Sequence, residues 1–153
     1  MKRYMVLLGI ALAALASSGA AAQTAKDLVG TWTLVSADVF GPNPKGYLMF
    51  DANGRVSAVL MRSDLPKYAS NNRNQGTAEE NKATVQGMIV WFGTYSVKGT
   101  DLMLHIEGSS FPNWNGSDQK RTNLSVTGDE LRWTQPTPSM GGPPVAVVWK
   151  RAK

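Results

Sequence analysis

Five side chains that can bind a ligand or move a proton are concentrated between residues 105 and 121. They are His105, Glu107, Asn113, Trp114 and Arg121. A histidine and a carboxylate can transfer protons, an arginine can pair with an acidic or carbonyl oxygen, and a tryptophan can stack on a ring. Set against apolar walls, such side chains form a pocket for a small, partly hydrophobic molecule.

Two predicted strands, 102–107 and 119–126, carry part of this set and are joined by a connection rich in Pro, Asn and Gly. Alternate residues of a strand share a face, so His105 lies beside Glu107 and opposite the apolar Leu104. The pattern leaves two orientations open. His105 and Glu107 point into solvent if the apolar face is the inner one, and into the lumen if the apolar face is covered from outside.

The remaining chain also consists mostly of short segments rich in β-branched and aromatic residues and separated by turns. Eight strands are predicted, over residues 30–40, 46–50, 55–62, 90–97, 102–107, 119–126, 130–135 and 145–150. Such a series is typical of an antiparallel up-and-down sheet, and eight strands can close into a barrel without exposed edges. We therefore predict an all-β fold, an eight-stranded antiparallel up-and-down β-barrel.

One short helix interrupts the strands, between the third and the fourth. Thr77 and Glu80 have the spacing of a capping box, which predicts a helix over residues 78–86. The polar segment 63–76 precedes it, and together they could form a lid over the barrel. Arg62, at the base of this segment, is a candidate ligand-binding residue; the alternative is a salt bridge to Asp64.

Several motifs resemble the bacterial and fungal lipocalin-like domain family, a group of calycin-type β-barrels. They are Gly30-Thr31-Trp32, residues 61–66, Gly93-Thr94-Tyr95, and Phe111-Pro112-Asn113-Trp114 between His105 and Arg121. The resemblance covers residues 28–151. It implies structural roles for Gly30, for Trp32 as a plug at one barrel end, and for Arg151 as the cation that covers this tryptophan. It also implies that His105 takes part in the site.

The first 22 residues have the pattern of a secretory signal peptide. A basic start, an apolar run over residues 5–15, and Ala20-Ala21-Ala22 predict cleavage near Ala22. We expect a single mature domain over residues 23–153, periplasmic or secreted, without a membrane anchor.

Composition argues against several classes of protein. Without Lys2 and Arg3, the chain keeps 14 basic and 11 acidic residues, a net charge of +3, and its basic residues are scattered rather than clustered as in nucleic-acid-binding proteins. The chain has no cysteine, its one histidine is His105, and its carboxylates are dispersed. We therefore expect no metal, no cofactor and no nucleic acid, and a monomer whose partner is a small hydrophobic or amphipathic ligand.

Two other functions remain open at this point. An isomerase or cyclase would use His105 as general acid or base, Glu107 as a second proton-transfer group, and Arg121 to stabilise an oxyanion. A protein-interaction or inhibitor module would instead use the loops at one barrel end, above all the Pro- and Gly-rich loop 136–144.

Overall fold

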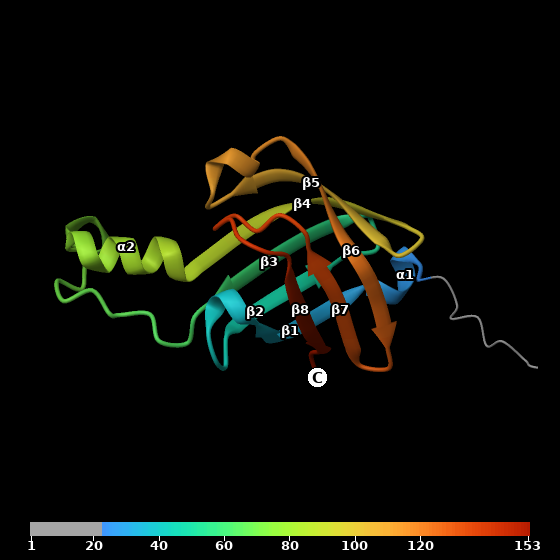
Figure 1. The fold of residues 1–153 in the computed structure, drawn as a ribbon, viewed down its shortest axis with the longest axis horizontal. Coiled ribbons are helices and arrows are strands. Elements are labelled where there is room, and N and C mark those ends of the chain that lie inside the picture. The colour runs from blue at the N-terminus through green and yellow to red at the C-terminus, as the bar shows by residue number, and fades with distance from the viewer. Residues whose placement is uncertain (1–22) are drawn as a thin grey trace, which may run out of the picture.

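The computed structural model describes residues 23–153, in which eight antiparallel strands form a closed barrel (Figure 1). Each strand pairs with the next, and β8 closes the barrel against β1. The strands are β1 (Gly30–Ala37), β2 (Lys45–Phe50), β3 (Arg55–Met61), β4 (Met88–Lys98), β5 (Asp101–Ser109), β6 (Ser117–Thr127), β7 (Glu130–Gln135) and β8 (Val145–Arg151). The predicted eight-stranded up-and-down barrel is confirmed. The predicted signal peptide lies outside the described residues.

The first strand is shorter than predicted. The chain leaves the sheet after Ala37 in a 3₁₀ turn, η1 (Asp38–Phe40), and Gly41 then adopts a φ of 71°. This turn buries the Phe40 side chain in the core. Tertiary burial therefore outweighs the β-propensity of Val39 and Phe40.

Helix α2 (Ala78–Gly87) begins at the predicted capping box. The Glu80 amide donates to Thr77 Oγ1 at 3.2 Å, and the Thr77 amide donates to Glu80 Oε2 at 2.8 Å. The helix projects away from the barrel, beyond the end at which β4 begins (Figure 1). It therefore does not cover the whole mouth, but its Val85 and Gln86 line a hollow together with Phe40, Ser139 and Met140 of the mouth. Its Val85 is exposed, and only Gly87 is buried, so α2 has no apolar face large enough to hold it over the mouth.

The end of the barrel near residue 23 is closed by a short helix, α1 (Ala25–Leu28). Leu28 is buried, and its carbonyl accepts a hydrogen bond from Trp32 Nε1 at 2.8 Å. The Arg151 guanidinium lies 4.1 Å from the centroid of a Trp32 ring and donates to the carbonyls of Val29 and Asp27, both at 3.1 Å. These contacts tie the end of β8 to the start of β1.

Inward side chains from all eight strands fill the barrel. Trp32, Leu48, Leu102, Ile106, Leu131 and Trp149 are completely buried. The connections that follow β1, β3, β5 and β7 lie at the end of the barrel opposite α1 (Figure 1). The candidate site is at this end. Among residues 23–153, no helix has the length and apolar character needed to cross a membrane.

Candidate functional site

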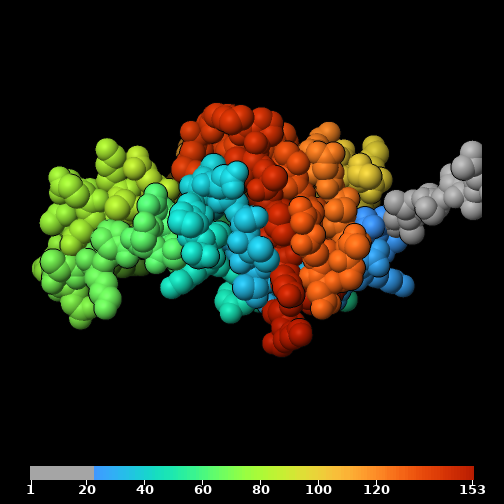
Figure 2. Space-filling view, turned by 60° about the horizontal axis from the view of Figure 1, so that its bottom comes forward, coloured from blue at the N-terminus to red at the C-terminus, as the bar shows by residue number. Residues whose placement is uncertain are grey.

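An apolar pocket opens at the end of the barrel opposite α1. Its cavity volume is about 60 Å³. Its walls include Leu60, Ile89, Trp91, Trp133, Val145 and Val147, and three connections form its mouth: η1, the 3₁₀ turn η3 (Pro112–Trp114), and the loop 136–144. Figure 2 shows this loop, in red-orange, beside the cyan segment that includes η1.

Arg121 brings a positive charge into this apolar pocket. It lies opposite the buried Leu102 in the β5–β6 pairing, so its side chain points inward, and only 3% of the residue is exposed. Its guanidinium carbon lies 5.7 Å from the ring centroids of both Trp91 and Trp114. This arrangement places a cation between two aromatic rings.

No carboxylate within residues 23–153 lies at ion-pair distance from Arg121. Its hydrogen bond is from Nη1 to the carbonyl oxygen of Lys120, at 3.3 Å. Burial lowers the pKa of Arg121 to about 9. The guanidinium therefore stays charged at neutral pH, and its charge has no counterion among these residues.

Gln135 supplies a second polar group to the pocket, one that the sequence analysis did not select. The residue is 7% exposed, and its Nε2 donates to the Thr137 carbonyl at 2.7 Å. Its Oε1 is buried and has no hydrogen-bond partner among the described residues. The alternation of Leu131, Trp133 and Gln135 along a predicted strand is the signal that could have placed it inside the barrel.

Trp114 lies at the mouth, held there by the turn that the sequence predicted. Pro112 begins η3, and Ser117 Oγ donates to the Trp114 carbonyl at 2.7 Å. The ring packs edge-on against Phe111, with centroids 5.9 Å apart. Asn113, in the same turn, is exposed and does not line the pocket.

His105 lies on the outer face of β5, away from Arg121. Its Nδ1 is 2.7 Å from Asp118 Oδ1, and the two side chains are 49% and 85% exposed. Leu104, on the opposite face of the same strand, is buried in the core. Since only one face of a barrel strand can point inward, the expectation that His105 faces the lumen is corrected.

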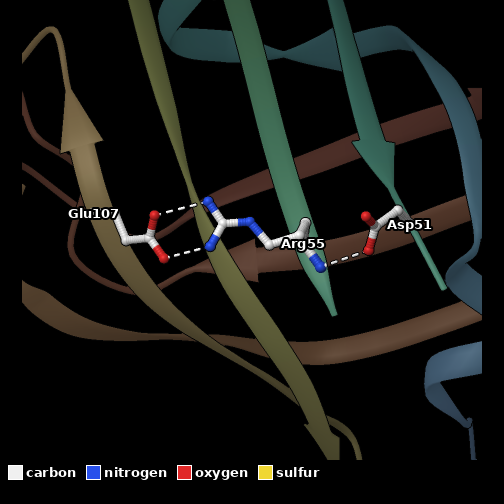
Figure 3. A network of polar contacts seen from close by, with 3 residues as sticks. All are labelled: Asp51, Arg55 and Glu107. Carbon is white, nitrogen blue, oxygen red and sulfur yellow. Dashed lines mark hydrogen bonds and ion pairs between the residues drawn. The ribbon is translucent and has the colours of Figure 1, made fainter. Parts of the chain in front are cut away.

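Glu107 shares the outer face with His105 and takes part in an ion pair across β4 (Figure 3). Arg55 reaches over from β3, and its Nη2 donates to Glu107 Oε2 at 2.7 Å while its other terminal nitrogen donates to Oε1. The backbone amide of Arg55 donates to Asp51 Oδ1 at 2.7 Å. The hydrogen bonds from Arg55 keep the pKa of Glu107 below its usual value, so this carboxyl is held as an ionised surface group.

Arg62 also lies outside the pocket. Its Nε and Nη2 donate to the two carboxylate oxygens of Asp64, each at 2.8 Å, and the hydrogen bonds lower the pKa of Asp64. The pair lies on a surface hollow with Leu65 and Gly87. Of the five predicted ligand-binding residues, the structure brings Trp114 and Arg121 together in the pocket and places His105, Asn113 and Arg62 elsewhere.

A closed eight-stranded barrel with an apolar pocket at one end has the architecture of small-molecule-binding β-barrels. The model of the lipocalin-like domain family matches residues 29–152, and the chain belongs to this family. Membership of this family supports a general role as a binding protein.

Several solved structures are similar to this chain, among them two from Bacteroides species. One is a lipocalin-like protein from Bacteroides uniformis, with a TM-score of 0.45 and 16% identity over 82% of this chain and 99% of the other. The other is an uncharacterised protein from Bacteroides eggerthii, with a TM-score of 0.43 and 13% identity over the same shares. No match was found among curated proteins.

Proposed function

We propose that this protein binds a small, partly hydrophobic molecule that presents an acidic or carbonyl oxygen to Arg121. The observation that carries the proposal is the buried guanidinium of Arg121, which has no carboxylate partner within residues 23–153 and lines an apolar pocket. Burying an unpaired charge costs several kcal/mol. A ligand oxygen would pair with the guanidinium, so the unpaired charge has a function in binding.

Binding accounts for the pocket better than catalysis by the predicted acid–base pair. Among the described residues that line the pocket, Arg121 is the only titratable one, so they supply an oxygen-binding group and no general base. His105 and Glu107 lie on the outer face, His105 in contact with Asp118 and Glu107 in an ion pair with Arg55. An isomerase or cyclase would need His105, Glu107 and Arg121 in one pocket, and only Arg121 lies in it.

We also propose that the protein acts outside the cytoplasm, since residues 1–22 have the signal-peptide pattern. N-terminal sequencing of the protein recovered from the periplasm or the medium tests this. A chain beginning near Gln23 is expected, whereas an intact Met1 in the cytoplasmic fraction would contradict export.

Native mass spectrometry of the exported protein tests the binding proposal. We expect added mass that is lost on denaturation, and we expect Arg121→Met to lose it. Lys120→Met is the matched control, because Lys120 is the exposed neighbour on the same strand and pairs with Asp101 on the surface. Added mass that survives in Arg121→Met would show that the ligand is held elsewhere.

A further inference from the structure

We infer that the ligand is a hydroxy-substituted aromatic acid, which pairs its acidic oxygen with Arg121 and donates its hydroxyl hydrogen to Gln135 Oε1. This inference rests on the proposed binding function and narrows it to one chemical class. Both side chains are more than nine-tenths buried, and both line the same apolar pocket. A ligand in this pocket therefore meets a cation and a neutral acceptor.

The orientation of the Gln135 amide determines what the ligand must offer. Its nitrogen is identified by the 2.7 Å hydrogen bond to the Thr137 carbonyl, because a carbonyl can only accept and only the amide nitrogen can donate. The other atom, Oε1, is therefore an acceptor, and it is buried without a partner among the described residues. The hydrogen bond of Arg121 goes to the Lys120 carbonyl and leaves Oε1 unpaired, so a ligand hydroxyl reaches this enclosed oxygen when neighbouring side chains or the loop 136–144 move.

A buried acceptor without a partner discriminates between ligands. A hydroxyl group at this position satisfies Oε1, whereas an apolar group leaves it unpaired and a second anionic oxygen is repelled by it. Arg121 selects the opposite chemistry, since a guanidinium only donates. Arg121 thus favours an acidic group at one point of the ligand, and Gln135 favours a hydroxyl group at another.

The surroundings of the two polar groups favour an aromatic body between them. Four aromatic side chains line the pocket, those of Phe40, Trp91, Trp114 and Trp133. Flat rings stack against such surfaces and lose little conformational entropy on binding, unlike a flexible acyl chain.

Isothermal titration calorimetry on the mature protein tests this inference with matched acids. The panel is ortho-, meta- and para-hydroxybenzoate and a hydroxynaphthoate, each compared with its parent acid and with its methyl ether, which keeps the oxygen but cannot donate. We expect at least one hydroxy acid to bind about tenfold tighter than its parent acid and its ether, as one satisfied buried acceptor would give.

Two variants assign the two contacts. Gln135→Met is expected to bind hydroxy and parent acids equally, and Arg121→Met to lose both. Gln75→Met, at an exposed position in the 3₁₀ turn η2 (Arg73–Gln75), is the control and should behave as the wild type. If Gln135→Met fails to fold by circular dichroism, the comparison of hydroxy acids with their ethers on the wild type decides the matter alone.

Three results would overturn the inference, and they separate it from the proposed function. Acids that bind through Arg121 without preference for the hydroxyl would overturn the inference and leave the proposed function standing. A preference that persists in Gln135→Met would show that another residue reads the hydroxyl. Failure of every acid in the panel to bind would overturn the inference, whereas the proposed function is decided separately by the added mass in native mass spectrometry and its loss in Arg121→Met.

Discussion

At the scale of single residues, the strongest indication of function is the buried charge of Arg121. It lies between Trp91 and Trp114, and its charge has no counterion within residues 23–153. A residue selected for stability alone would be apolar here, because well-packed apolar groups often replace buried charges with a gain in stability. If Arg121 serves binding, replacing it with an apolar residue should raise the stability of the protein and lower its affinity for the ligand.

We expect Arg121→Met to unfold at higher denaturant concentration than the wild type while losing the ligand. Relief of the buried charge outweighs the lost cation–π contacts, so the free energy of unfolding should rise by on the order of 1 kcal/mol or more. Urea titration measures this, with Lys120→Met as the control for removal of a surface charge. A loss of stability would show that the guanidinium is a structural element of the barrel.

Acid binding should also depend on pH in the alkaline range. Burial lowers the pKa of Arg121 to about 9, and a bound anion favours the charged form. The affinity for a carboxylate should be flat from about pH 6 to 8 and fall up to tenfold per pH unit above 9, as measured by calorimetry. An affinity that stays constant to pH 10.5 would contradict a pKa near 9 for Arg121 and show that the guanidinium remains charged over this range.

The same shift has a defined effect on stability. Above pH 9 the folded state releases a proton that the unfolded state still holds, because the folded pKa is the lower one. The contribution of Arg121 to the free energy of unfolding therefore rises as pH increases above 9. The difference between the wild type and Arg121→Met isolates this contribution from the other groups that titrate there.

At the scale of elements, the pocket mouth is built from connections rather than strands. The loop 136–144 contributes Pro138, Ser139 and Met140, and half of the Met140 surface is exposed. The cavity volume of about 60 Å³ is room for only a few water molecules, so an organic ligand either displaces this loop or extends past it.

Ligand binding should therefore alter hydrogen exchange in the loop 136–144. We expect the amides of Ser139, Met140 and Gly141 to exchange more slowly in the complex, since a ligand that fills the mouth gives the loop a surface to pack on. Hydrogen–deuterium exchange with mass spectrometry measures this, and the β2–β3 turn at the opposite end serves as the internal control. Unchanged exchange in the loop would contradict entry of the ligand through this mouth.

Helix α2 should be dispensable for binding, although its cap is well formed. Thr77→Ala removes the capping hydrogen bond and should cost about 0.5–2 kcal/mol, confined to the first turns of the helix. Faster hydrogen exchange over residues 78–81 with unchanged ligand retention is expected, because no residue of α2 lines the pocket. Glu79→Ala, which spares the capping box, is the control; loss of the ligand in Thr77→Ala would restore the lid hypothesis.

At the scale of the whole molecule, α1 closes one end of the barrel and the apolar pocket lies at the other. Arg151→Met should loosen the closed end, because the side chain covers Trp32 and donates to two carbonyls of the N-terminal segment. We expect a loss of about 2–4 kcal/mol in the free energy of unfolding, measured by urea titration. The exposed neighbour Lys150→Met is the control, and ligand affinity below the melting temperature should not change.

The sequence was sufficient to predict the architecture. The β-branched and aromatic segments, the Asn53-Gly54 turn and the Thr77–Glu80 capping box are local signals, because they depend on neighbours within a few residues. The site was harder to predict, since it depends on which strand faces meet inside the barrel. Trp114 and Arg121 were selected from their chemistry, whereas Gln135 was not, because an unpaired amide oxygen is defined by its surroundings and not by its residue type.

The amino-acid sequence by itself determined the number of strands, their order and the alternation within each of them. Only the tertiary structure decided which face of β5 points inward. Alternation is symmetric, so it groups His105 with Glu107 and separates them from Leu104, but it assigns neither group to the lumen. Closure of the barrel breaks this symmetry, because Leu102, Leu104 and Ile106 pack into its narrow interior. The polar face of the strand then points to solvent, where Glu107 pairs with Arg55 and His105 contacts Asp118.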